Sequence, residues 1–438
     1  MSIANLLNKQ TGRLALVAAS AVCVFSLAIN TASAGDREKA KFIHDRIAGV
    51  PPETIAGPGN DVLDLMEQDI AASNFAAAVT RAMNDPNFLN VKVKNMVIPW
   101  TNEDQTVFAP LNDTAATIIG YIRDGRDFRG ILSDDLIYVG VDPALNSFPY
   151  SNSNNNHYIQ MEHQNLNLRT VLQSQTQSST IGQPAEAVAG ITTTRGNARA
   201  FFYGGTNRAM FRFTMMNYLC TDLEEVKDIT RTNNYVRQDV SRSPGGDSEI
   251  FLNNCVGCHA GMDGMAGAYA YHQWGPNIFD DNNDADTQSM LYQTTPITYQ
   301  IDGVDITTPT RVTHKHRINP TNFEYGWVTP DDRWTNYWRT GQNAKLGWAN
   351  NTPQAVRSVP ASTPGAPVGN AALLGQELAN TTAFARCQVL KVYRHVCLSD
   401  PAEATLQTLT TNFVNSTYDM RTVFTDSVIN CMNSNPNL

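Results

Sequence analysis

The sequence predicts a mainly α-helical fold made of more than one unit. Apolar residues recur at intervals of three and four along much of the chain, as on the buried face of a helix. Helix-stopping residues follow several of these stretches, such as Gly49 and Asp85-Pro86. The chain has 438 residues, which is long for one hydrophobic core. We therefore expect a helical domain at residues 35–240, a distinct segment at 241–350, a Pro-rich linker at 351–370 and a C-terminal helical region at 371–438.

The first residues have the pattern of a secretory signal peptide. Lys9 and Arg13 precede an apolar run at residues 14–29, and small residues lead up to Ala34. We expect cleavage after Ala34 and a periplasmic or secreted protein. No later stretch has the roughly 18 uninterrupted apolar residues of a membrane span, so none is expected in the mature chain.

Apolar periodicity and capping residues locate the individual helices. Residues 36–48 are expected to end at Gly49, and Asn60 to cap a longer helix that stops before Pro86. The same criteria predict helices at residues 36–48, 60–85, 113–123, 133–138, 196–220, 384–396, 401 onward and 418–429.

Two stretches of the N-terminal part have a simpler interpretation than ligand binding. Residues 151–183 are rich in Ser, Asn and Gln and predict a long surface excursion, in which His157 and His163 would be solvated. In the helix at 196–220, the methionines alternate with phenylalanines, which favours core packing. Arg208 and Arg212 of this helix could reach an anionic ligand group, but an exposed or core-paired arginine is the simpler expectation.

Residues 254–260 contain the pattern Cys255-Val-Gly-Cys258-His259, which is typical of covalent haem attachment. Positions i and i+3 share one face of a helix, so both thiols can add to the vinyl groups of one porphyrin. The next residue, His259, can then bind the iron from the proximal side. We expect a helix that begins near Asp247 or Ser248, after the break at 244–246, and glycines 261, 264 and 267 to end it.

Two other chemistries use closely spaced cysteines. A structural zinc site needs a second pair of ligands, and His314 and His316 form the only nearby pair, at a poor spacing. A thioredoxin-like CxxC motif should follow a strand of a βαβ unit, which the sequence does not suggest. The pattern therefore favours one covalently attached haem c.

The remaining cysteines predict two disulfides. Cys23 would leave with the signal peptide, so Cys220, Cys387, Cys397 and Cys431 remain for an oxidising compartment. Cys387 and Cys397 lie ten residues apart in one predicted helix, about 15 Å, which is too far for a bond. We therefore expect one of them to pair with Cys220 and the other with Cys431; buried free thiols are the alternative.

Five of the six tryptophans fall in the segment 241–350, at positions 274, 327, 334, 338 and 348. They could form the walls of a large apolar cofactor, and an ordinary aromatic core would explain them equally well.

The pieces PGGDSEIFLNN and AGMDGMAGA on either side of the motif resemble secreted bacterial c-type cytochromes with a single CxxCH and extensive helical regions. RAFF at 199–202, DDRWTNYW at 331–338 and FARCQVLKVYRHVC at 384–397 strengthen this resemblance, which implies no particular activity. Residues 274–278 (WGPNI) are similar to the Gly-Pro-Asn-Leu stretch of class I cytochromes c. That similarity implies that the Pro276 carbonyl accepts a hydrogen bond from the ligand imidazole.

The ligand on the other face of the iron decides between electron transfer and small-molecule chemistry. Met290 is the candidate methionine, and His272, His314 and His316 are the nearest candidate histidines; His395 lies beyond the linker. The sequence does not choose among them.

The leading interpretation is a periplasmic or secreted monohaem c-type cytochrome that transfers single electrons. Loss of Lys9 and Arg13 with the signal peptide would change the formal charge from −9 to −11, which disfavours nucleic acid and suits a basic redox partner. The alternatives are a haem enzyme, peroxidase- or oxygenase-like, with an open distal site, and a binding or structural protein that contains haem.

Overall fold

The structure is a computed structural model that describes residues 35–53, 61–202, 207–275, 288–292, 298–301, 304–307, 326–327, 329–350 and 370–438. The predicted signal peptide (1–34), the linker (351–369), the Pro276 stretch, His314 and His316 lie outside these residues. In the part of the chain described, no helix combines the length and the apolar character needed to cross a bilayer.

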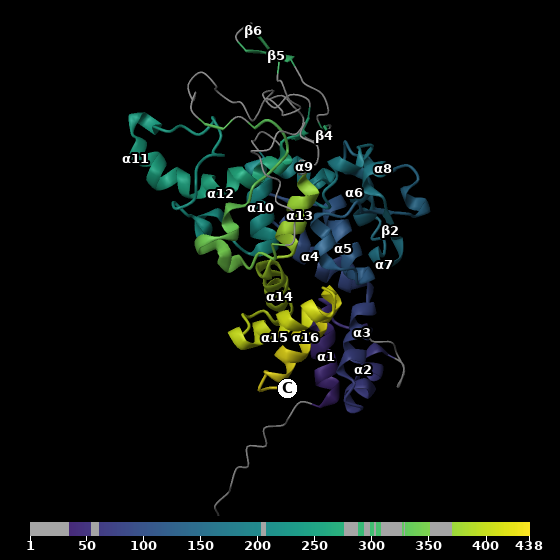
Figure 1. Cartoon of the computed structure of the whole chain (residues 1–438). Helices are drawn as coiled ribbons and strands as arrows, with labels where there is room; N and C mark the ends of the chain where they lie inside the picture. The colour runs from purple at the N-terminus through teal and green to yellow at the C-terminus, as the bar shows by residue number, and fades with distance from the viewer. Residues whose placement is uncertain are drawn as a thin grey trace, which may run out of the picture.

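The prediction of a mainly α-helical fold is confirmed (Figure 1). The helices are α1 (Asp36–Ala48), α2 (Val62–Ala71), α3 (Phe75–Asn84), α4 (Lys94–Val97), α5 (Asp113–Asp124), α6 (Asn156–His163), α7 (Leu168–Val171), α8 (Gln177–Ile181), α9 (Arg195–Phe201), α10 (Arg208–Leu219), α11 (Ser248–Ile250), α12 (Val256–Ala266), α13 (Ala371–Ala379), α14 (Thr382–Cys397), α15 (Glu403–Asn415) and α16 (Met420–Asn433).

Strands form three separate antiparallel pairs. They are β1 (Ile137–Gly140) with β2 (Leu172–Gln175), β3 (His272–Trp274) with β4 (Met290–Tyr292), and β5 (Thr298–Ile301) with β6 (Val304–Thr307). No strand pair joins another in the described residues, so helix packing determines the architecture.

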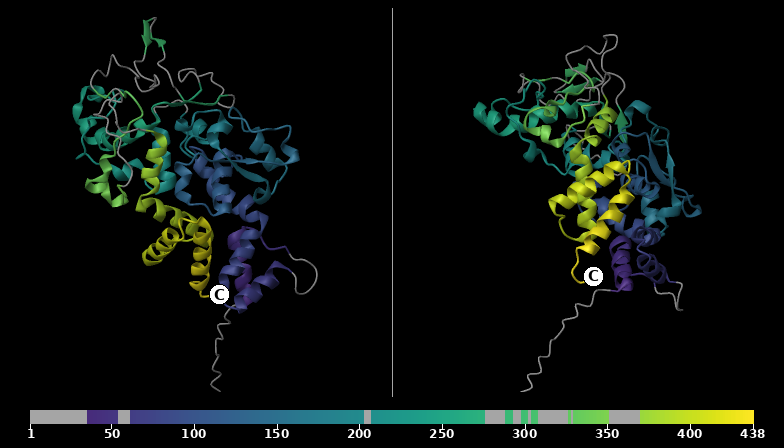
Figure 2. Two further views of the ribbon diagram at one scale, coloured as in Figure 1. Left: turned by 45° about the vertical axis from the view of Figure 1, so that its right-hand side comes forward. Right: turned by 60° about the horizontal axis from the view of Figure 1, so that its bottom comes forward.

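The first and last helices of the chain lie side by side. α1, α2 and α3 pack on one another, and α16 packs on α1 and α3 (Figures 1 and 2). α14 continues from this group and packs against α10, which in turn packs against α12. One hydrophobic core runs through these helices, from Ala40 in α1 to Met432 in α16.

Several predicted helices are correct, and others are divided. α1 ends at Gly49, whose φ of 76° is left-handed, as its position after the last apolar residue predicted. The single helix predicted at 60–85 is wrong: α2 begins after the cap Asp61, and α3 begins after Asn74, whose side chain accepts a hydrogen bond from Ala77 N. The continuous helix predicted at 196–220 is likewise divided into α9 and α10.

The predicted helix at 133–138 is also wrong, because part of this stretch belongs to β1. Ile137, Tyr138 and Val139 are consecutive buried residues with high strand propensity, and they pair with β2. The predicted surface excursion at 151–183 instead contains α6, α7, β2 and α8. His157 is buried there and accepts a hydrogen bond from Gly140 N, whereas His163 is exposed as expected.

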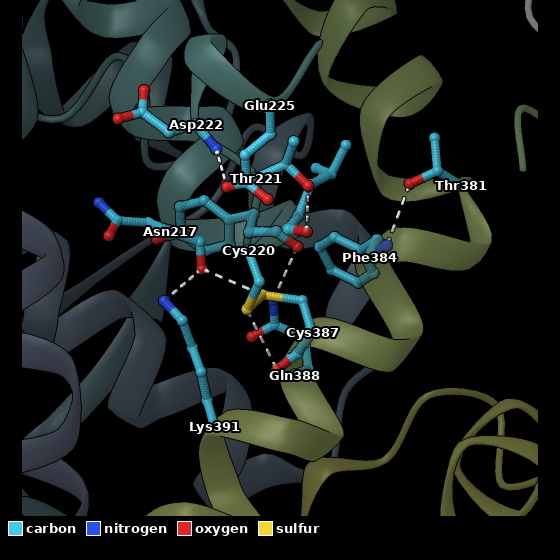
Figure 3. Close-up of a disulfide and its surroundings, with 12 residues drawn as sticks. Asn217, Cys220, Thr221, Asp222, Glu225, Thr381, Phe384, Cys387, Gln388 and Lys391 are labelled. Atoms are coloured by element: carbon cyan, nitrogen blue, oxygen red, sulfur yellow. Dashed lines mark hydrogen bonds between the residues drawn. A yellow bond between two sulfur atoms is a disulfide. The ribbon is translucent and has the colours of Figure 1, made fainter. Parts of the chain in front are cut away.

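The structure has two disulfides, as expected, and selects one of the two pairings that the sequence left open. Cys220 bonds Cys387, with their Cα atoms 5.3 Å apart, and Cys397 bonds Cys431, with theirs 5.7 Å apart. The first bond fastens the end of α10 to α14, and beside it Lys391 Nζ donates to Asn217 O at 2.6 Å (Figure 3). The second joins α14 to α16. Cys255 and Cys258 are the free cysteines of the described chain.

Candidate functional site

The CxxCH motif lies at the N-terminal end of α12, directly after a short irregular helical segment. Asp247 caps α11 by accepting a hydrogen bond from Glu249 N, as predicted. A π-helical turn, Phe251–Cys255, then leads into α12. Cys255 therefore stands at the N-terminal end of α12, with Cys258 and His259 in its first turn.

The expectation that glycines end this helix is correct for Gly267, the C-cap after Ala266, and wrong for Gly261 and Gly264, because α12 continues through both. A Cβ atom on Gly261 would lie 2.0 Å from Trp338 Nε1, and one on Gly264 would lie 2.8 Å from Thr335 O. The glycines therefore allow residues 335–338 to pack directly on the helix. The result is a rigid support behind the motif.

The two thiols of the motif lie in partly open surroundings. Both cysteines are half-buried. Cys258 Sγ is 3.5 Å from Leu223 O, and burial raises the pKa of the Cys258 thiol. Cys255 packs against an apolar cluster made of Val236, Val240, Phe251, Val256 and Ala260. Such half-buried thiols can be reached by a ligand that covers this face.

Large apolar side chains are exposed on the segments that carry and flank the motif. Ile229 is 64% exposed and lies beside Gly257, where its Cγ2 would be 3.4 Å from an added Cβ. Leu252 and Ile250, in the turns before Cys255, are 52% and 39% exposed. Exposed apolar groups around reactive side chains are typical of a ligand-binding surface.

The imidazole of His259 faces a buried carboxylate on the same helix. His259 Nδ1 is 3.3 Å from both oxygens of Asp263, one helical turn later. The His259 side chain is 21% exposed, whereas the Asp263 side chain is fully buried. A hydrogen bond from Nδ1–H to this carboxylate leaves Nε2 available as a metal ligand.

Arginine holds the Asp263 carboxylate in place. Arg208 Nε and Nη2 donate to its two oxygens at 2.7 and 2.8 Å, and Arg237 N donates to Oδ2 at 3.1 Å. Burial alone would raise the pKa of Asp263, but Arg208, His259 and Arg237 together hold it well below its usual range. Asp263 is therefore a fixed carboxylate anion.

A second carboxylate completes this ionic group. Arg208 Nη1 and Nη2 donate to Asp239 at 2.6 and 2.9 Å, and Arg237 Nε lies 3.9 Å from Asp239. Despite the burial of Arg208, these carboxylates raise the pKa of its guanidinium. Arg208 is thus core-paired as expected, and Arg212 pairs with Asp222 at the surface.

Sequence reasoning missed Asp263 and Asp239. The i, i+4 spacing of His259 and Asp263 could have identified the first, because such residues are neighbours on a helix. Asp239 and Arg208 come from separate segments, and only the tertiary fold brings them to α12.

The structure places two of the candidate distal ligands elsewhere in the fold. His272 and Met290 belong to β3 and β4, which pack against α9. His272 is buried, and its Nε2 donates to Ala187 O at 2.8 Å. Among the described residues, His259 interacts with Asp263 and with neither of these side chains.

His395 lies in the last turn of α14. Its Nε2 donates to Lys92 O at 2.9 Å, and Lys92 Nζ donates to His395 O at 2.7 Å. Burial, together with Lys92, lowers the pKa of His395 to about 4. This residue connects α14 to the N-terminal helices.

The tryptophans behind the motif form an aromatic core. Trp274, Trp334 and Trp338 are almost completely buried in the main hydrophobic core, and Trp338 also packs against Phe211 of α10. Of the two explanations given for the tryptophans, core packing accounts for these three.

The residues present fit a covalently attached haem. Two free, half-buried thiols lie one turn apart on a helix, a histidine with an oriented Nδ1 follows them, and exposed apolar side chains lie nearby. Within the described residues, no group of three or more His, Cys, Asp or Glu side chains could hold a metal ion.

Comparisons of the chain with protein families, with curated proteins and with solved structures found no significant match.

Proposed function

We propose that this protein is a monohaem c-type cytochrome of the periplasm or cell exterior that transfers single electrons. The observation that carries the proposal is the pair of free, half-buried thiols on one turn, followed by His259 with its Nδ1 directed at Asp263. Haem bound at this site would supply one-electron iron chemistry.

Each residue of the motif has a defined part in this proposal. Cys255 and Cys258 would hold the haem through thioether bonds to its two vinyl groups, with each thiol hydrogen passing to the neighbouring vinyl carbon. His259 would offer Nε2 to the iron. Ile229, Ile250 and Leu252 are exposed apolar groups that a porphyrin edge can contact.

The electron donor and acceptor would meet the protein at this same surface, because the chain has a single CxxCH motif. The acidic composition, with a formal charge of −9, favours a basic partner that docks faster at low ionic strength.

One observation favours the haem enzyme as a second candidate. A carboxylate hydrogen-bonded to a ligand imidazole makes that imidazole a stronger electron donor, which stabilises the more oxidised iron. A peroxidase- or oxygenase-like activity would use this property together with an open distal position.

The test begins with haem staining on a denaturing gel, since thioether bonds survive unfolding. The wild-type chain should stain, and Cys255→Ser together with Cys258→Ser should abolish staining. The matched control, Cys397→Ser with Cys431→Ser, removes two cysteines outside the motif and should stain as the wild type does. Staining that persists in the motif variant would refute covalent attachment at this site.

The absorption spectrum then separates the two candidate functions. A six-coordinate, low-spin haem that does not react with carbon monoxide is expected for electron transfer. A high-spin haem that binds carbon monoxide and turns over peroxide with an oxidisable substrate would replace electron transfer with the enzyme.

A further inference from the structure

The surroundings of His259 assign a role to a residue outside the CxxCH motif. We propose that Asp263 is the positioning residue for the haem-ligating imidazole, and that it shifts the haem toward the ferric state. This inference rests on the proposed function, because it concerns His259 as an iron ligand.

The first argument is geometric. Nδ1 of His259 has a single hydrogen, and the nearest acceptors in the structure are the two Asp263 oxygens at 3.3 Å. When this hydrogen is shared with the carboxylate, the lone pair of the neutral ring is on Nε2, on the opposite side of the imidazole. Because both residues belong to α12, the helix itself fixes their relative position.

The second argument concerns the rigidity of the carboxylate. Arg208 holds both oxygens of Asp263, and the backbone N–H of Arg237 holds one of them. With its side chain fully buried, Asp263 cannot exchange these donors for water. The acceptor for Nδ1–H is therefore part of a rigid frame, as an orienting partner must be.

The third argument concerns charge. Asp263 and Asp239 carry two negative charges, and Arg208 and Arg237 offset them with two positive charges. Asp263 is thus placed as an anionic acceptor for the Nδ1–H group of His259. The imidazole is polarised by a nearby anion, and this stabilises ferric iron over ferrous iron.

This arrangement differs from the one that the Gly-Pro-Asn-Leu resemblance implies, in which the Pro276 carbonyl accepts the hydrogen bond. Nδ1–H serves one strong acceptor at a time, and an anionic acceptor forms the stronger hydrogen bond. Asp263 is therefore the partner that the described residues favour.

The test is a redox titration of the full-length haem protein with Asp263→Asn. The amide keeps the shape of the side chain but removes its charge. We expect the ferric–ferrous equilibrium to move at least tenfold toward the ferrous state, which is about 59 mV for a one-electron couple. Haem staining should be retained, because the thioether bonds do not involve Asp263.

The matched control is Asp239→Asn, which removes an equivalent charge from Arg208 without touching His259. It should move the equilibrium by less than threefold. Equal shifts in the two variants would mean that only net charge matters, and an unchanged equilibrium in Asp263→Asn would also overturn the role.

If Asp263→Asn does not accumulate, the wild-type protein provides the measurement. In the diamagnetic ferrous form, the Nδ1 proton of His259 should exchange with solvent over minutes or longer and be visible by NMR. Complete exchange within the dead time would overturn the proposal. A wild-type chain without covalent haem would instead contradict the proposed function itself.

Discussion

The helical body of the molecule and the region around the motif bury different kinds of side chains. In the body, formed by α1–α5 and α14–α16, the buried residues are mostly apolar, and many polar side chains cap helices. Around α12, two carboxylates and two arginines form one group that is largely withdrawn from solvent, and large apolar residues are exposed.

The two kinds of burial contribute differently to the free energy of folding. Burial of apolar side chains stabilises the body directly. A buried ionic group is often no more stabilising than a well-packed apolar one, because each charge loses its hydration. The ionic group beside His259 therefore agrees with the role proposed for Asp263, which does not require the group to stabilise the fold.

The largest expected effect comes from cutting the bond that joins the two regions. Cys220–Cys387 links α10 to α14 across 167 residues of sequence, whereas Cys397–Cys431 lies within the body and spans 34. Loop-closure entropy gives upper values of about 5 and about 4 kcal/mol, respectively. We expect Cys220→Ser with Cys387→Ser to lower the free energy of unfolding more than Cys397→Ser with Cys431→Ser.

Urea unfolding, followed by circular dichroism and by haem absorbance, measures this difference. In the variant without the linking bond, the haem signal should change at a lower urea concentration than the helical signal. A larger loss of stability in the variant without Cys397–Cys431 would contradict the predicted order of the two disulfides. Coincident haem and helical signals in both variants would mean that the two regions unfold as one cooperative unit regardless of the bond.

Local patterns predicted the body well where caps and apolar spacing agree. α1 was predicted residue by residue, because Gly49 ends it. The length of the helix that separates Cys387 from Cys397 correctly excluded a bond between them, but it did not show which of the two pairs with Cys220. Predictions failed where tertiary context decides. β1 and β2 form because each supplies hydrogen bonds to the other, and His157 is buried because Gly140 meets it from another element.

The motif itself is local and could be read from the sequence, but its surroundings could not. Cys255, Cys258 and His259 are contiguous on one helix. Arg208 lies in α10, 55 positions before Asp263 in the sequence, and donates hydrogen bonds to the Asp263 carboxylate. Such pairings depend on how α10 and α12 pack, which no single-segment pattern contains.

The next effect in size concerns pH and tests the contact between His395 of α14 and Lys92. His395 in α14 has its pKa lowered to about 4 by burial and by Lys92, against about 6.5 when unfolded. Between these values the unfolded chain binds a proton that the folded chain does not, so stability is lost as the pH falls. We expect a loss of about 2–3 kcal/mol between pH 7 and pH 4 from this residue.

His395→Gln provides the comparison, since the amide can still donate to Lys92 O but cannot titrate. Thermal unfolding of both proteins should show a shallower pH dependence in the variant. Burial also lowers the pKa of His157, which remains in both proteins and cancels in the difference. Parallel curves for the two proteins would show that His395 does not carry the acid sensitivity.

The smallest expected effect is on stability, and it comes from replacing two glycines of α12 by alanine. Gly261→Ala would place a Cβ 2.0 Å from Trp338 Nε1, and the buried indole would have to move. Overpacking of this kind costs about 1–3 kcal/mol. Gly257→Ala, one turn earlier on the same helix, meets nothing closer than Ile229 Cγ2 at 3.4 Å, and the better helix propensity of alanine can stabilise it by up to about 1 kcal/mol.

The two alanine variants therefore differ in packing while sharing the same helix and the same change in propensity. Urea unfolding of the haem-loaded proteins should place Gly261→Ala below the wild type and Gly257→Ala at or slightly above it, with equal haem staining in all three. If both variants were equally stable, residues 335–338 would not form a rigid support for α12. The position of His259 and Asp263 would then depend on the Arg208 group and on the packing of α10 against α12, and not on residues 335–338.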